Sequence, residues 1–84
     1  MQLNITTDYA IRMVLYLAMK QGAISSREIS EMLGIPKTYI SKITKKLENA
    51  GLINISVGVY GGFSIEKPAN QINLLNIIEA MENK

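Results

Sequence analysis

The stretch 24-ISSREISEMLGIPKTYISKITKKLENAGLI-53 decides the fold. Near its start, Ser25 is followed three residues later by Glu28, which is the pattern of a capping box at the beginning of a helix. In that motif the serine accepts a hydrogen bond from the glutamate amide, and the glutamate side chain reaches back to the serine amide. We therefore predict a short helix over about 26–33, ended by Gly34. We expect its buried side to carry Ile29, Met32 and Leu33.

A longer helix is predicted over about 36–50, after a turn in which Pro36 holds Ile35 in an extended conformation. Its apolar residues recur every three to four positions, as one buried helix face requires. They are Ile40, Ile43, Leu47 and Ala50. The opposite face carries small hydrogen-bonding residues and lysines, namely Thr38, Ser41, Lys42, Lys45 and Asn49, flanked by Lys37, Tyr39 and Lys46. Two helices joined in this way predict a helix-turn-helix whose second helix enters the major groove of DNA.

The residues after the second helix predict a β-hairpin. Ile53, Ile55 and Val57 alternate with polar residues, and Phe63 and Ile65 do the same beyond a glycine-rich turn. A hairpin that follows a helix-turn-helix is the wing of a winged helix, which reaches the DNA backbone or the adjacent minor groove. The predicted fold is therefore mainly α with a small β-hairpin, a winged helix-turn-helix.

The tip of this hairpin is apolar, although a turn that faces solvent is ordinarily polar. We expect Val59, Tyr60 and Gly61 to lie against sugars and groove walls of bound DNA, with the glycines allowing a close approach of the backbone. The alternative is that Tyr60 folds back onto the domain and that the glycines only shape the turn.

Two further helices flank this unit. The first is predicted from an N-cap at Thr7 to about Gln21, and the last begins after Asn73. The first helix is apolar on nearly all sides, so we expect one of its faces to meet a second subunit. The candidate dimer-interface residues are Leu15, Met19, Leu75 and Ile78.

Composition narrows the function. The 84 residues include no cysteine and no histidine, which removes the usual zinc sites and the catalytic dyads and triads, so we expect neither catalytic nor metal-binding residues. The segment 36–51 holds four lysines against one glutamate, a local charge of +3 compared with +2 for the chain. Without an apolar run long enough for a membrane span, and without a signal-peptide layout at the start, the sequence predicts a cytoplasmic protein.

We expect one domain over 1–84, with the helix-turn-helix at about 26–50, the wing at about 52–67 and the last helix at about 74–82.

The chain resembles the Rrf-two (BadM-type) family of bacterial winged-helix transcription regulators. Besides the stretch 24–53, the resemblance lies in MQLNITTDYAIRMVLYLA at 1–18 and GVYGGFSIEKPANQINLLNIIEAME at 58–82. Two features depart from the family. The wing lacks the usual arginine or lysine before its glycines. The chain also lacks the three cysteines and the long dimerisation helix that follow the wing in cluster-binding members.

The chain is therefore either a truncated form or a short relative. We expect no cofactor in this chain. An iron–sulfur cluster is expected only if the natural protein is longer. In some cluster-binding relatives a carboxylate near the start of the first helix completes the coordination. Asp8 matches that position, but pairing with Arg12 at the positive end of the helix dipole is the reading we prefer here.

The function expected is that of a sequence-specific repressor that binds double-stranded DNA as a homodimer on a palindromic operator. Ser26 and Arg27, at the start of the shorter helix, are expected to hold the DNA backbone. Tyr39 is expected to contact phosphate or to pack against the wing. The alternative is a winged helix used for protein interaction, with the apolar wing as its docking element. An enzyme is the weakest possibility, because the carboxylates are scattered.

Overall fold

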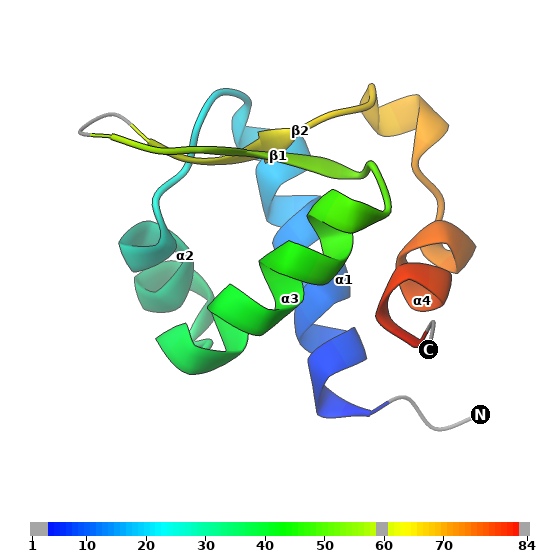
Figure 1. Ribbon diagram of the computed structural model, residues 1–84, viewed down its shortest axis with the longest axis horizontal. Coiled ribbons are helices and arrows are strands. Elements are labelled where there is room, and N and C mark those ends of the chain that lie inside the picture. Colours follow the sequence, from blue (N-terminus) through cyan, green and yellow to red (C-terminus); the bar gives the residue numbers. More distant parts are fainter. Residues whose placement is uncertain (1–3, 59–60, 83–84) are drawn as a thin grey trace.

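The computed structural model describes residues 4–58 and 61–82 (Figure 1). The order of elements is that of the predicted winged helix-turn-helix, and the predicted fold class is confirmed. Its elements in chain order are α1 (Ile5–Lys20), α2 (Ser26–Leu33), α3 (Lys37–Asn49), β1 (Ile53–Ser56), β2 (Gly62–Ile65), the 3-10 turn η1 (Ala69–Gln71) and α4 (Leu74–Glu82).

The turn between α2 and α3 forms for the reasons read from the sequence. The Ser25 hydroxyl accepts from the Glu28 amide at 3.1 Å, which starts α2. Gly34 ends the helix in the left-handed region at φ 69°, where a side chain would be strained. Within α2, Ile29 is fully buried and Leu33 half-buried, but Met32 is exposed, so the prediction for Met32 is wrong. A helix this short buries only the narrow strip that meets its neighbours.

The start of α1 differs from the prediction. Asn4 is the N-cap, because its side-chain oxygen accepts from the Thr7 amide at 2.8 Å. Thr7 lies inside the first turn, where its side chain is buried and its hydroxyl donates to the Glu82 carboxylate at 3.4 Å. Both residues have side chains suited to capping, and only the position of the core shows which of them stands at the helix end.

Replacing Asn4 with alanine is expected to lower the free energy of unfolding by about 1 kcal/mol, because the Thr7 amide loses its partner. Chemical denaturation of the two proteins measures the difference. Asn49, the exposed last residue of α3, serves as the control. Its replacement by alanine is expected to change the free energy of unfolding by less than about 0.5 kcal/mol. Equal effects at the two positions would contradict the assignment of Asn4 as the cap.

One hydrophobic core joins the helices to the hairpin. α1 contributes its inner face, α3 contributes its apolar stripe, and single residues come from α2, the turns, β1 and α4. The buried apolar residues are Ala10, Met13, Val14, Leu17, Ile24, Ile29, Ile35, Ile40, Ile43, Leu47, Leu52, Ile53, Ile77 and Met81. Ala50, predicted on the buried stripe of α3, is exposed because the helix ends there and the chain turns into β1.

The hairpin is tied to the helices by a short bridge. β1 and β2 pair antiparallel, with Ile53 opposite Ile65 and Ile55 opposite Phe63. Beyond them, Ile24 exchanges two backbone hydrogen bonds with Phe63, at 2.9 and 2.8 Å, so the residue that precedes the α2 cap also lies against β2. This short bridge at Ile24 holds the base of the hairpin next to the helix-turn-helix.

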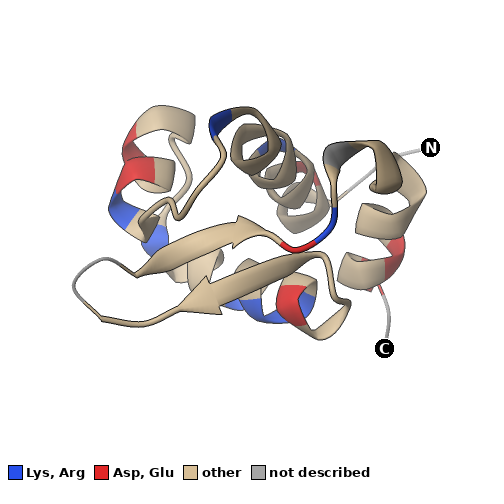
Figure 2. Cartoon of the chain, turned by 90° about the horizontal axis from the view of Figure 1, so that it is seen from above, with Lys and Arg blue, Asp and Glu red and all other residues tan. Residues whose placement is uncertain are grey.

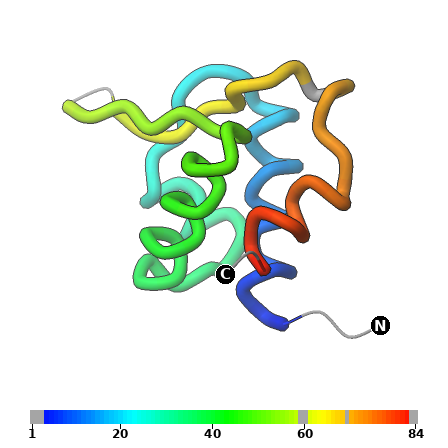
Figure 3. The backbone as a smooth tube through the Cα atoms, turned by 45° about the vertical axis from the view of Figure 1, so that its right-hand side comes forward, coloured from blue at the N-terminus to red at the C-terminus, as the bar shows by residue number. Residues whose placement is uncertain are grey.

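The last helix lies on the far side of the molecule from α2. α1 runs between them, and α4 packs against both α1 and α3 (Figure 3). Asn73 caps α4 as predicted, accepting from the Asn76 amide at 2.8 Å. Within residues 4–58 and 61–82, no helix is long and apolar enough to cross a membrane.

Candidate nucleic-acid interface

The outward face of α3 carries the polar residues that the sequence placed there. Thr38, Ser41, Lys42 and Lys45 are all exposed, while Ile40, Ile43 and Leu47 on the other side are buried. Figure 2 shows lysines of α3 beside and beneath the hairpin. The exposed face therefore offers hydroxyl groups and ammonium groups together, which are the groups that contact phosphates and base edges in a DNA groove. Lys37, at the first turn of α3, is exposed as well.

Two neighbouring side chains on α3 point elsewhere. Thr44 is buried, and its hydroxyl donates to the Ile40 carbonyl at 2.8 Å. Lys46 is directed to α4, where its ammonium donates to the Met81 carbonyl at 3.2 Å. A cation near the C-terminal end of a helix is favoured by the helix dipole, so this lysine stabilises the last turn of α4. The positive charge available on the outward side of α3 therefore comes from Lys37, Lys42 and Lys45.

Tyr39 packs against α1. Its ring meets the ring of Tyr9 edge to face, with centroids 5.4 Å apart and an interplanar angle of 74°. The expectation that Tyr39 packs against the wing is therefore wrong, because the first turn of α3 lies beside α1. The side chain is half-buried, so one part of it remains accessible next to Thr38.

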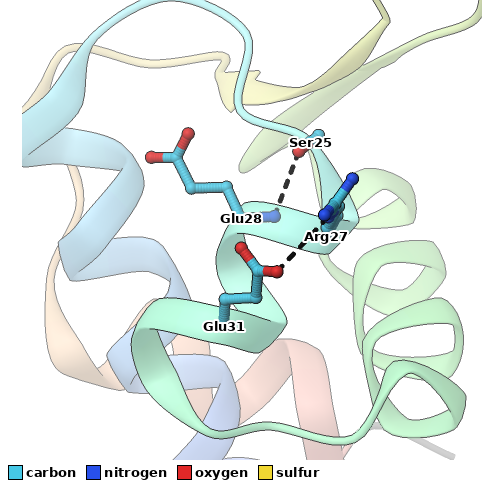
Figure 4. Close-up of polar contacts among 4 residues, drawn as sticks. All are labelled: Ser25, Arg27, Glu28 and Glu31. Atoms are coloured by element: carbon cyan, nitrogen blue, oxygen red, sulfur yellow. Dashed lines mark hydrogen bonds and ion pairs between the residues drawn. The ribbon is translucent and has the colours of Figure 1, made fainter.

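The start of α2 presents a second group of donors. Ser26 is half-buried, and Arg27 has a side-chain exposure of 78%. The Arg27 guanidinium pairs with the Glu31 carboxylate at 3.3 Å, one turn along the helix (Figure 4). Exposed ion pairs of this kind contribute at most about 1 kcal/mol, so the guanidinium is available to a phosphate.

The second half of the predicted capping box is absent at Glu28. Its carboxylate points away from Ser25 toward α1 (Figure 4) and accepts from the Tyr16 hydroxyl at 2.6 Å. This hydrogen bond, together with burial and the charge of Glu28, raises the pKa of Tyr16. The phenol therefore remains a donor at neutral pH. The sequence showed both residues but not that α1 brings a hydroxyl to this carboxylate.

The wing is uncharged from Leu52 to Ile65. Val59 and Tyr60, predicted to contact DNA, lie outside the described residues. Gly61 is half-buried, and a Cβ atom at this position would stand 2.5 Å from the Ser56 carbonyl oxygen. The turn itself therefore requires glycine at position 61.

These groups come from elements on one side of the molecule. The start of α2, the first half of α3 and the free end of the hairpin all lie on the left of Figure 1, whereas α4 lies on the right. The arrangement can grip a duplex through helix α3, the α2 amides and the wing, without using the α4 side.

The candidate dimer-interface residues lie on α1 and α4. Leu15, Met19 and Leu75 are 58%, 80% and 61% exposed, and Ile78 is half-buried. Leu74, the first residue of α4, is also exposed. Beside Leu15 and Leu74, a small apolar hollow separates α1 from the start of α4. Exposed apolar side chains of this size on adjacent helices are typical of a surface that another chain covers.

The chain does not fit an iron–sulfur cluster. It contains no cysteine and no histidine, and the described residues hold no group of three acidic, cysteine or histidine side chains that would enclose a metal ion. Asp8 instead pairs with Arg12, with 3.3 Å between guanidinium nitrogen and carboxylate oxygen. The pairing predicted for Asp8 is confirmed.

Comparison with known proteins gives a consistent result. The family model Rrf2, described as an iron-dependent transcriptional regulator, matches residues 3–84. The CymR protein of S. aureus in its oxidised form is 30% identical, with a TM-score of 0.89 over 100% of this chain and 69% of that chain.

Two more distant structures share the fold. CymR, the global cysteine regulator of B. subtilis, is 24% identical, with a TM-score of 0.93 over 100% of this chain and 67% of that chain. IscR of T. potens is also 24% identical, with a TM-score of 0.90 over 99% of this chain and 62% of that chain.

Proposed function

The chain belongs to the Rrf2 family of DNA-binding transcriptional regulators, and on that premise we propose that it represses transcription by binding a palindromic operator as a homodimer. The members of this family are regulators and not enzymes. Because the DNA that a bacterial regulator binds lies in the cytoplasm, we place the action of this protein there.

The observation that carries this proposal is the outward face of α3. Thr38, Ser41, Lys42 and Lys45 stand on the exposed side of a helix whose other side is locked into the core. In the proposed complex α3 lies in the major groove, the lysines neutralise phosphates or contact guanine edges, and the hydroxyls contact base edges or phosphate. Lys37 and Tyr39 stand at the entry of the helix into the groove.

The backbone of the duplex is held on either side of α3. At the start of α2, Ser26 and Arg27 offer backbone amides and a guanidinium, both suited to a phosphate. The wing, with Val59, Tyr60 and Gly61 at its tip, reaches the sugars and the minor groove beyond. Its lack of charge favours apolar contact there in place of phosphate neutralisation.

A dimer supplies the contact area and the positive charge that one small domain lacks. Leu15 and Met19 on α1 and Leu75 and Ile78 on α4 are the proposed contact residues. Two copies of α3 about 34 Å apart would read the two halves of a palindrome one helical turn apart. The chain spans about two thirds of the length of the CymR chains.

The test is the salt dependence of DNA binding. If each domain neutralises about six phosphates, a plot of log affinity against log salt has a slope of about −5 per domain. Fluorescence anisotropy of a labelled duplex, selected from a random pool by the protein, measures this slope between about 50 and 200 mM salt. Undetectable binding across this range would reject the proposal.

The lack of charge on the wing favours a second candidate function, in which the winged helix binds another protein. Under that hypothesis the chain has little affinity for DNA at about 0.1 M salt, where the proposed regulator retains specific binding. The same titration therefore separates the two functions. Protein binding of this kind would depend on Tyr60, the large side chain at the wing tip, and replacing it with serine would abolish it.

A further inference from the structure

The first turn of α2 has donors without partners in the described chain. The amides of Ser26 and Arg27 belong to the first helical turn, where no carbonyl of the helix can reach them. The Glu28 amide is occupied by Ser25 Oγ at 3.1 Å, and the Ile29 amide by the Ser25 carbonyl at 3.1 Å. Two amides and the positive end of the helix dipole therefore face outward together.

A carboxylate stands close to these donors. In a complete capping box Glu28 would turn back to the Ser25 amide and place its negative charge over the first turn of α2. That charge would occupy the helix end and repel a phosphate that approaches it. In this chain Glu28 is turned the other way, because the Tyr16 hydroxyl donates to its carboxylate at 2.6 Å.

The groups around this contact favour the turned-away position. Tyr16 is half-buried on α1 and packs against the hydrophobic core, so its ring has little freedom to follow Glu28. The Lys20 ammonium lies 5.7 Å from the centre of the Tyr16 ring and adds positive charge on the α1 side. The other two charged residues of α2, Arg27 and Glu31, pair with each other. Arg27 therefore does not draw the Glu28 carboxylate away from the Tyr16 hydroxyl.

We propose that Tyr16 is a positioning residue for DNA binding: it holds the Glu28 carboxylate against α1, so that the N-terminus of α2 stays open to a DNA phosphate. The inference rests on the proposed function. It assigns to α1 a part in DNA binding that needs no contact between Tyr16 and the duplex.

The decisive substitution is Tyr16→Phe, which keeps the ring and removes only the donor. Glu28 is then free to close the capping box, and its charge approaches the phosphate. We expect the affinity for the duplex to fall by about threefold to tenfold, the effect of one like charge a few ångströms from the phosphate in water. Adding Glu28→Gln to Tyr16→Phe removes that charge and is expected to restore the affinity of the Glu28→Gln single variant.

This cycle separates positioning from a general loss of structure. Weaker binding in Tyr16→Phe that Glu28→Gln does not restore would show a purely structural role and would overturn the inference. Unchanged binding in Tyr16→Phe would overturn it as well. Tyr9→Phe, the same change on the same helix at a ring that keeps its contact with Tyr39, is expected to leave the affinity within about twofold.

The outcome also distinguishes this inference from the proposed function. If the unmodified chain binds the selected duplex and the Tyr16→Phe and Glu28→Gln variants behave additively, only the role of Tyr16 is wrong. If the unmodified chain itself fails to bind, the proposed function is wrong and the inference falls with it.

Discussion

For each bound domain, replacing Lys42 and Lys45 together with alanine is expected to lower DNA affinity about 60-fold at about 0.1 M salt. Each phosphate contact contributes about 0.9 to the slope of log affinity against log salt, so two lost contacts flatten a slope of about −5 to about −3. The difference between the two proteins should shrink as salt rises and disappear near 1 M, about where counterion release no longer favours binding. Anisotropy titrations at several salt concentrations measure both quantities.

A matched control removes one lysine from another part of the surface. Lys67 follows β2 and lines a hollow together with residues of α4, and it is not on α3. Lys67→Ala is expected to change affinity by less than about twofold, whereas Lys42→Ala alone lowers it about eightfold at about 0.1 M salt. Equal losses at Lys42 and Lys67 would mean that net charge alone attracts DNA, and the assignment of the α3 face would be abandoned.

Gly62→Ala is expected to lower the free energy of unfolding by about 3 kcal/mol. A Cβ atom at this position would stand 2.5 Å from the Ile24 carbonyl oxygen and 2.7 Å from the carbonyl carbon, closer than backbone atoms can tolerate. Relief requires β2 to move away from Ile24, which breaks the two hydrogen bonds between Ile24 and Phe63. A chain of this size has a total stability of about 4–13 kcal/mol, so the loss is a large part of it.

Gly34→Ala is the control for this substitution. Gly34 also requires a positive φ, at 69°, but nothing lies within 4 Å of the place its Cβ would take. Its replacement is expected to cost about 1 kcal/mol, the conformational strain alone. Denaturant unfolding of both variants compares the two costs, and a Gly62→Ala effect no larger than that of Gly34→Ala would disprove the close approach of β2 to Ile24.

Local patterns were sufficient for most of the backbone. The helix-turn-helix depends on Ser25, Gly34 and the apolar spacing of α3, all of which act within a few residues. The predicted turn and helices are confirmed, although Ala50 at the end of the apolar stripe is exposed. The N-cap of α1 was misplaced because Asn4 and Thr7 both suit that position, and the choice depends on which of them the core buries.

The side-chain partners could not be predicted, because they come from distant segments. The sequence offered Glu28 a local partner in the Ser25 amide, but its carboxylate accepts from the hydroxyl of Tyr16, twelve residues earlier. Lys46 was expected to flank the polar face of α3, but its ammonium donates to the carbonyl of Met81, 35 residues later on α4. The proposed DNA contacts stay predictions, since they concern a partner and not the fold.

The hydrogen bond between Lys46 and Met81 connects the C-terminal half of α3 to the last turn of α4. Lys46 lies one residue beyond Lys45 on α3, and its ammonium is fastened to the last turn of α4, which Thr7 also holds through Glu82. Displacing α4 would therefore break this hydrogen bond together with the packing between α3 and α4.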